Sequence, residues 1–431
     1  MTIQQSIKQE TWSLLKKIGF RFSFIYFALI ITFQNNGAYP FWGLLMQKPN
    51  EWLYKLIPWV GENILNISYE IRTGPNGSGD TTYDYLVVFV IFVLAIIGML
   101  VWSLLDRKRI NYTKLYYWLS VALRFYVGLM LINYGMVKVI QLQFQPPTFY
   151  RLLETYGESS PMGLAWTFLG FSKGYNLFMG IAEVLAGLLL FRRTLTFGAI
   201  ITLMTTMNVM AVNYFFDVPV KILSTHLVLM TLFLLSRDLP KLIKFFFTKK
   251  SIQLEIIKQP FKNRQLKIVL MTLKGLFLGY IFIFGAIQTL GMQKQFGAKA
   301  PKPAMYGLYE IKDFKIKNDT VALPSFFIGD NAWKYLAIER EGRLQLTKQD
   351  RSRDFYSIET DTTNQVIKFT GGNSPAGPFD FNYKKLEDSY IDFNFIYQSD
   401  TIIGKAKYLT KEDFLLTNRG FHWINEFPMN R

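Results

Sequence analysis

The sequence predicts a membrane protein made of a bundle of about seven transmembrane α-helices and a C-terminal all-β domain. Half of its 431 residues are hydrophobic and only 18% are charged, whereas about a quarter of the residues in soluble domains are charged. Several apolar runs approach or exceed the roughly 20 residues that a helix needs to cross a bilayer. After residue 296 these runs give way to short alternating segments with polar turns, which are typical of antiparallel strands.

Seven apolar segments are predicted to span the membrane, and the first of them is shorter than the others. No cleavable signal peptide is expected, because the chain starts with polar residues and no small-residue cleavage site follows the first apolar run. The seven predicted spans are 18–33, 85–105, 115–139, 175–191, 195–215, 220–235 and 268–290.

The distribution of Lys and Arg predicts the orientation of these spans. The segments on one side hold 19 Lys and Arg, and the loops on the other side hold six. Because basic loops remain cytoplasmic, we expect an inner (cytoplasmic) membrane protein whose N-terminus is cytoplasmic and whose β-domain is extracytoplasmic. The basic segments are 1–21, 106–114, 192–193 and 237–267, and the others are 34–82, 139–173 and 214–221.

Four regions follow from this reading. Residues 1–110 form a two-helix region with an extracytoplasmic loop at 34–82, and residues 111–237 form a four-helix core. Residues 238–295 hold a cytoplasmic loop and the last span, and residues 296–431 form the β-domain, an antiparallel sandwich or small barrel. The predicted strands are "WKYLAIER", "RLQLTKQ", "FYSIET", "QVIKFT", "FDFNYKK", "YIDFNFIY" and "IIGKAKYL".

Charge and cysteine content exclude several functions. The net charge of +17 is concentrated at the membrane edges, so anionic lipid headgroups are the expected partners and nucleic acid is not. The chain has no Cys, which excludes disulfides, thiolate catalysis and iron–sulfur clusters. Redox chemistry would therefore need a bound cofactor such as a quinone, or a partner chain. No cluster with metal-ligand spacing is present.

Three outer segments have distinctive sequences. "EWLYKLIPWVGENIL" is amphipathic and is predicted to lie on the membrane surface. The glycines of "TGPNGSGDTTYDY" either form a flexible loop or cradle an anion near Asp80. "QPPTFYRLLETYGESSPMGLAWTFLGF" is too polar to span the membrane and is predicted to cover the helices as a re-entrant or surface-lying cap.

The C-terminal segment "FLLTNRGFHWINEFPMNR" has two readings. The first is a last strand and a tail packed by its aromatic side chains, because buried aromatic residues mostly serve packing. The second is a docking surface. The sequence favours the packed tail.

Ionisable residues within the predicted spans are the main functional candidates. Arg124, Glu183 and His226 lie about 15, 13 and 16 Å from the cytoplasmic flank of their own helices at 1.5 Å per residue. We therefore expect an Arg124–Glu183 ion pair near mid-membrane with His226 in the same polar pocket, because an isolated charge there is costly. Such a pair is either a structural link between helices or part of a ligand or proton path.

A second set of polar residues is predicted at the outer mouth of the bundle: Lys138, Asn213, Asp217 and Lys221. Interfacial snorkelling of long side chains is the alternative explanation for it. Glu183 and His226 are the catalytic candidates. The predicted ligand-binding set is Arg124, Lys138, Glu183, Asn208, Asn213, Asp217, Lys221 and His226.

The block 117–235 resembles the DoxX family of four-helix membrane proteins. The residues that carry the resemblance are "LRFYVGLMLINYGMVK", "GIAEVLAGLLLFRR" and "NYFFDVPVKILSTHL". With "YGESSPMGLAWTF", "GSGDTTYDY" and "NRGFHWINEFP", the whole chain resembles a long DoxX-like subgroup that ends in an extracytoplasmic domain. The family name derives from a membrane subunit of a thiosulfate:quinone oxidoreductase, and other members associate with redox partners.

The resemblance implies a membrane subunit that binds a quinone-like molecule or a lipid within an envelope redox or assembly complex. More distantly, the bundle resembles that of vitamin K-dependent carboxylase-like proteins, and the alternative is an enzyme that uses Glu183 or His226 for proton transfer. A transporter is a third alternative. It is disfavoured because the sequence shows no inverted repeat of broken helices.

Overall fold

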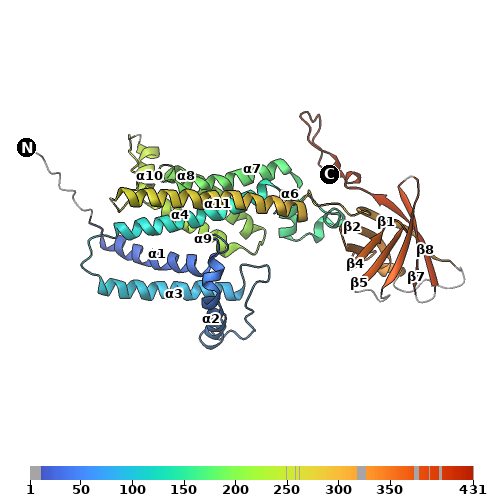
Figure 1. The fold of residues 1–431 in the computed structure, drawn as a ribbon, viewed down its shortest axis with the longest axis horizontal. Coiled ribbons are helices and arrows are strands. Elements are labelled where there is room, and N and C mark those ends of the chain that lie inside the picture. Colours follow the sequence, from blue (N-terminus) through green and yellow to red (C-terminus); the bar gives the residue numbers. More distant parts are fainter. Residues whose placement is uncertain are drawn as a thin grey trace, which may run out of the picture. The chain divides into compact units, whose positions relative to one another are not determined.

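The computed structural model describes residues 11–248, 250–257, 259–261, 263–317, 327–372, 378–387, 389–397 and 400–430. The chain divides into two compact units, drawn in Figure 1. The helical unit comprises Met1–Gln143 and Lys173–Gly291, and the barrel unit comprises Phe144–Ser172 and Met292–Arg431. Residues 1–10, which the sequence placed on the cytoplasmic side, lie outside the described residues.

Apart from α2, which corresponds to the predicted surface-lying segment, the long helices of the helical unit begin and end within a few residues of the predicted apolar segments. The fourth predicted span is the exception, because its second half is a 3-10 helix, η2. The elements are α1 (Leu14–Phe33), α2 (Trp42–Asn63), α3 (Thr82–Leu105), α4 (Thr113–Val139), α7 (Lys173–Val184), η2 (Leu185–Leu190), α8 (Leu195–Phe215), α9 (Lys221–Ser236), α10 (Leu239–Thr248) and α11 (Arg264–Phe296), whose last turn passes into the barrel unit.

Fewer helices than predicted have the length and composition to cross a membrane. Among the described residues, five helices qualify, or six if α9 and α10, which are bent by 72°, form one broken span. Helix α1 carries Lys16, Lys17 and Arg21 among its 20 residues and is not one of them. The prediction of a membrane protein stands, and the prediction of seven spans is not confirmed.

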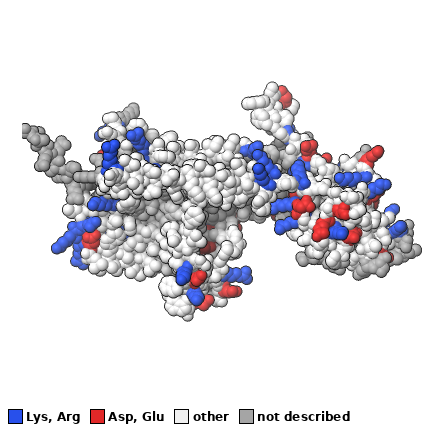
Figure 2. Space-filling model, viewed as in Figure 1, with Lys and Arg blue, Asp and Glu red and all other residues white. Residues whose placement is uncertain are grey.

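Charged residues are unevenly distributed over the helical unit. On the face shown in Figure 2, Lys and Arg gather where α1 begins and α3 ends. The surface of the helical unit next to this end is an uncharged belt. We call this end, which carries Lys16, Lys17 and the segment 107–109, the basic end. Helix α2 runs across the direction of α1 and α3 (Figure 1) and is largely exposed, as a surface-lying helix would be.

Glycines bring the central helices together. Added Cβ atoms on Gly135 and Gly180 would each lie 2.7 Å from the other residue's carbonyl oxygen, so the backbones of α4 and α7 are nearly in contact. Gly128 of α4 and Gly198 of α8 likewise leave room for leucines of η2. Small residues permit such close crossings in membranes, and this crossing fixes which side chains of α4 and α7 meet.

The barrel unit holds a closed barrel of eight described antiparallel strands, in which β1 also pairs with β8. This resolves the predicted choice between sandwich and barrel. The strands are β1 (Gly307–Ile316), β2 (Trp333–Arg340), β3 (Arg343–Lys348), β4 (Arg353–Asp361), β5 (Val366–Gly372), β6 (Phe379–Lys385), β7 (Tyr390–Tyr397) and β8 (Asp400–Leu409).

Strand β1 is the one described strand that the sequence analysis missed. Its pairing with β8 shifts between Ile311 and Asp313, so Lys312 forms a bulge. A bulge adds one residue and interrupts the period-two alternation that identifies a strand. The other seven strands keep enough alternation to be recognised.

Aromatic side chains fill the barrel. Along β7 every second residue from Ile391 to Tyr397 is buried, and the rings of Phe381 and Phe393 stack at 4.8 Å. Phe393 faces Gly404, where an added Cβ would lie 2.3 Å from the phenyl ring. Eight strands leave space for either side chains or one small ligand, and here side chains occupy it.

The segment predicted to cover the helices belongs to the barrel unit. It contains α5 (Phe149–Leu153), η1 (Tyr156–Glu158) and α6 (Pro161–Phe171). The Phe149 amide donates to Glu339 of β2 over 3.0 Å, and the Arg353 guanidinium lies 3.8 Å from the Tyr150 ring centroid. The polar residues that prevent this segment from spanning therefore pair with polar residues on the barrel wall.

The packed-tail reading of the C-terminus is wrong for the described residues. The chain ends with η5 (Lys411–Asp413), α12 (Leu415–Asn418) and an irregular tail. Trp423 is 91% exposed and Phe427 is 83% exposed. The Trp423 ring contacts that of Phe421 at 5.0 Å, but neither side chain is buried. The tail thus presents aromatic surface.

Candidate functional site

The predicted site residues lie in separate places. The structure splits them into a buried ion pair between α4 and α7, a cationic cluster at the end of η2, a histidine–tyrosine contact between α9 and α1, and a polar turn before α9. It does not bring Arg124, Glu183 and His226 into one pocket.

Glu183 pairs with Lys138. The Lys138 ammonium donates to the Glu183 carboxylate over 2.8 Å, and the two side chains are 7% and 3% exposed. Lys138 lies three residues after Gly135 and Glu183 three residues after Gly180, so one helical turn separates the pair from the glycine crossing. The pair therefore strengthens the tightest helix contact in the unit, which is a structural role.

Arg124 is not the partner of Glu183, contrary to the prediction. It lies 14 residues before Lys138, about 21 Å along α4, and its Nε donates to the Leu189 carbonyl over 2.5 Å. The depth argument assumed that the basic flanks of all helices lie at one level. In the structure, the last residues of η2 contact α4 at Arg124, part-way along its length, so positions measured from different flanks are not comparable.

Arg124 belongs to a cluster of three cations that we call the η2 cluster: Arg124, Arg192 and Lys274. Lys274 of α11 donates to the Leu190 carbonyl and lies 4.5 Å from the Phe191 ring centroid. Arg192 donates to the Ile257 carbonyl over 3.4 Å. Arg124 and Lys274 therefore bind neighbouring carbonyls of η2, and Arg192 directly follows Phe191, whose ring Lys274 contacts. Sequence analysis missed Lys274, because only the packing of α11 brings it to η2.

Among the described residues, the η2 cluster has no acidic partner. Arg124 is only 3% exposed, yet within the described ranges no carboxylate pairs with any of the three cations. Apart from Nε, the guanidinium of Arg124 has no acceptor among those residues. Buried charges are normally paired, so this is the group in the helical unit whose chemistry is left open to a ligand.

His226 has two hydrogen-bond partners of its own. Its Nδ1 lies 2.7 Å from the Ile222 carbonyl, and its Nε2 lies 2.8 Å from the Tyr26 hydroxyl. A carbonyl only accepts, so Nδ1 carries a proton and donates to Ile222, while Nε2 shares the second hydrogen bond with the Tyr26 hydroxyl. The imidazole thus links α9 to α1, and both of its nitrogens have hydrogen-bond partners within the bundle.

The polar residues at the outer mouth organise the start of α9. Asp217 has a left-handed φ of 51° and accepts from Lys221 over 2.9 Å. Asn213 donates to the Val220 carbonyl over 3.3 Å. These contacts close the turn between α8 and α9.

Asp80 explains the glycine-rich loop. Its two carboxylate oxygens accept from the backbone amides of Lys221 and Ile222 over 2.7 and 2.9 Å. Helix α9 has no cap from its own N-cap residue, so a residue 141 positions earlier supplies it. The anion at this site is the loop's own carboxylate, which neither the flexible-loop nor the cradle reading anticipated.

Asp80→Ala is expected to destabilise the protein by about 1–2 kcal/mol, the upper part of the range for lost helix caps. The part-buried amides of Lys221 and Ile222 at the start of α9 lose their acceptor. The measurement is the unfolding midpoint of the purified protein in detergent. Asp217→Asn is the matched control, because asparagine tolerates the left-handed backbone at this position, Asp217 is 83% exposed and exposed ion pairs contribute roughly 0–1 kcal/mol. Equal effects of the two variants would contradict the capping role.

Asn208 is exposed on α8. It lies beside Met204 and Met207, which are 70% and 50% exposed. Its prediction as a ligand-binding residue rested on its polarity within an apolar span. The rotation of α8 that directs the Asn208 side chain outward cannot be predicted from composition.

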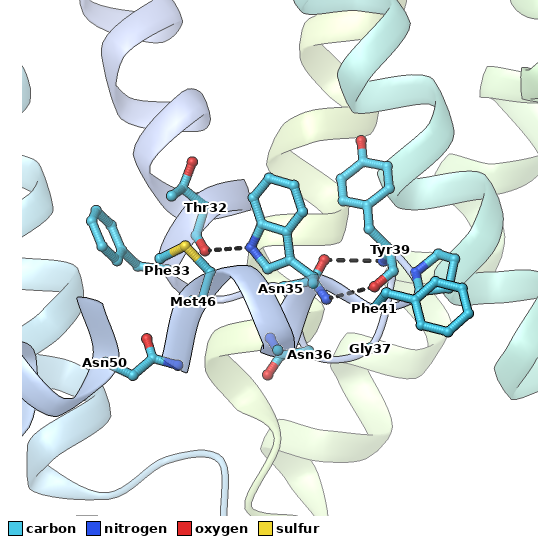
Figure 3. Close-up of a pocket in the computed structure, with 12 residues that line it drawn as sticks. Thr32, Phe33, Asn35, Asn36, Gly37, Tyr39, Phe41, Met46 and Asn50 are labelled. Atoms are coloured by element: carbon cyan, nitrogen blue, oxygen red, sulfur yellow. Dashed lines mark hydrogen bonds between the residues drawn. The ribbon is translucent and has the colours of Figure 1, made fainter. Parts of the chain in front are cut away.

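A further pocket lies where α1 ends and α2 begins, and the sequence analysis did not anticipate it (Figure 3). Its volume is about 450 Å³. The Trp42 indole donates to the Thr32 carbonyl over 2.9 Å, and the Asn35 side chain bonds the backbone of Tyr39. These bonds brace the loop 34–41. The pocket has no charged lining residue, which distinguishes it from the η2 cluster.

No metal centre is present in the described part of the chain, because no group of three or more His, Asp or Glu residues lies together there. The groups available for binding a ligand are therefore hydrogen-bond donors and cationic side chains.

Comparison with known proteins identifies one relative. The chain is 39% identical over 129 residues to the uncharacterized protein YwoB of Bacillus subtilis (strain 168), and the match covers 30% of this chain and 78% of YwoB. The chain belongs to the YwoB family. No family model matches it, and no solved structure matches it significantly. The similarity to YwoB spans less than a third of the chain, and the printed name of YwoB states no activity.

Proposed function

We propose that this chain is a DoxX-like integral membrane protein that binds an amphiphilic molecule, a quinone or a lipid, at the η2 cluster. The observation that carries the proposal is Arg124: a buried guanidinium with one backbone acceptor and no carboxylate among the described residues. An oxygen-bearing headgroup supplies the missing acceptors. Intramembrane ionisable residues of this kind mark ligand or ion paths.

The setting fits an amphiphile. Leu129 and Ile132 of α4, Leu190 of η2, and Leu278 and Ile281 of α11 form an apolar cluster in the same helix junction. Only Leu278 and Ile281 of α11 are buried, so a molecule in the surrounding lipid has access to this helix. A polar head at Arg124 and an apolar tail along α11 match this division.

The location proposed is the inner membrane, with the basic end cytoplasmic and the barrel outside. The charge asymmetry of the loops supports this orientation. The exposed aromatic residues of the tail, among them Trp423, support association with an envelope or redox partner. The alternative of an enzyme is disfavoured, because both candidate catalytic groups have partners within the bundle. Glu183 is bound by Lys138 and His226 by Tyr26.

Arg124→Met tests the proposal. Removing a buried charge that has no acidic partner is expected to leave stability unchanged or raised, while an amphiphile that co-purifies with the wild type is lost. The measurements are the unfolding midpoint and mass spectrometry of solvent extracts from protein purified out of native membranes. Arg264→Met, an exposed position on α11, is the control and should retain the molecule. Equal recovery from both variants would refute the proposal.

A further inference from the structure

We infer that the ligand of the η2 cluster is a glycerophospholipid whose phosphate is held by Arg124, Arg192 and Lys274, and this inference rests on the proposed function. The three side chains come from α4, the turn before α8, and α11. They meet at the end of η2, because Arg124 and Lys274 donate to the neighbouring carbonyls of Leu189 and Leu190 and Arg192 follows Leu190 by two residues.

The charge of the cluster argues for an anion. A quinone is neutral and would satisfy hydrogen-bond donors without offsetting the repulsion among three cations. The C-terminal carbonyls of η2, at Leu189 and Leu190, accept from Arg124 and Lys274 and offset it only in part, as partial charges do. A phosphate brings a full negative charge and several acceptor oxygens, and Arg and Lys are the side chains that bind it.

The cluster lies at a level where a lipid phosphate is found. Arg192 and Arg193 occupy the turn between η2 and α8, and Arg193 is exposed. An exposed charge is costly in hydrocarbon, so this turn must reach the headgroup region. Helical side chains point back toward their own N-terminus. The N-terminal ends of α4 and α11 both lie on this side, so Arg124 and Lys274 extend toward the headgroups.

The side of the membrane follows from neighbouring contacts. Thr196, just after the turn, donates to Asp238 beyond the end of α9 over 2.6 Å. Tyr116, in the first turn of α4, packs against Phe233 near the same end of α9 at 5.6 Å. The turn therefore faces the basic end, and the phospholipid comes from the leaflet on that side.

Lipid titration of the full-length protein tests the inference. Delipidated protein in detergent is titrated with phosphatidylglycerol, diacylglycerol, a menaquinone and inorganic phosphate, and bound species are counted by native mass spectrometry. Phosphatidylglycerol is expected to bind at least tenfold more tightly than diacylglycerol, because a hydrogen bond to a charged group is worth roughly a factor of ten or more. Lys274→Met should weaken it by about tenfold, and Arg264→Met should not.

The outcomes separate the two proposals. If the menaquinone or diacylglycerol binds as tightly as phosphatidylglycerol, the phosphate inference is overturned and amphiphile binding stands. If inorganic phosphate alone binds equally well, the lipid is overturned as the source of the anion. If no probe binds, amphiphile binding fails as well. Should Lys274→Met aggregate, Arg192→Met, in the turn, gives the same readout and must show the same loss.

Discussion

Glu183→Gln is expected to destabilise the protein by about 3–5 kcal/mol, the range for breaking a buried ion pair by removing one partner. Lys138 is 5% exposed, and without the carboxylate its charge stays in a low-dielectric helix junction. The measurement is the free energy of unfolding of the full chain in mixed micelles. Lys138→Met is expected to have an effect of similar size.

A double-mutant cycle identifies the partner of Glu183. Lys138→Met combined with Glu183→Met should be much less harmful than the sum of the single changes, because neither charge is left behind. Arg124→Met combined with Glu183→Met should instead be additive within about 0.5 kcal/mol, as for distant sites. Coupling of Arg124 but not Lys138 to Glu183 would contradict the observed pairing.

Gly180→Val is expected to lower stability by at least the 1–3 kcal/mol typical of overpacked cores. Its Cβ would lie 2.7 Å from the Gly135 carbonyl oxygen and from the Val139 amide nitrogen. Both atoms belong to the α4 backbone, so the helices must separate and the Lys138–Glu183 bond must lengthen. The unfolding midpoint and the strength of coupling between these two residues are the measurements.

Gly275→Ala is the matched control for the glycine crossing. No atom lies within 4 Å of a Cβ added there, and alanine is favoured over glycine in a helix by up to about 1 kcal/mol. This variant should be neutral or stabilised. Similar losses of stability in Gly180→Val and Gly275→Ala would show that the Gly135–Gly180 crossing is not unusually closely packed.

These tests distinguish two kinds of buried charge in one bundle. The Lys138–Glu183 pair is expected to matter for stability. Arg124, which has no acidic partner among the described residues, is expected to matter for binding. The sequence alone gave both the same interpretation, because both are ionisable residues in apolar segments.

The sequence by itself determined the membrane class, the limits of most helices and seven of the eight described strands. Each of these depends on local signals: apolar length for the helices and alternation for strands such as β7. The bulge at Lys312 removed that signal from β1. Binary alternation also predicted the inward-facing rings of the barrel, but not that Gly404 makes room for Phe393.

Only the tertiary structure decided which polar groups meet. Helix rotation directs Asn208 outward, and helix stagger places Lys138 rather than Arg124 beside Glu183. Asp80 caps a helix 141 residues away. Contacts between helices depend on relative translation and rotation, which are set by the close approach of Gly135 and Gly180. A single sequence specifies how far a residue lies from the end of its own helix. Positions in different helices can be compared only after the helices have packed, because packing sets their relative translation.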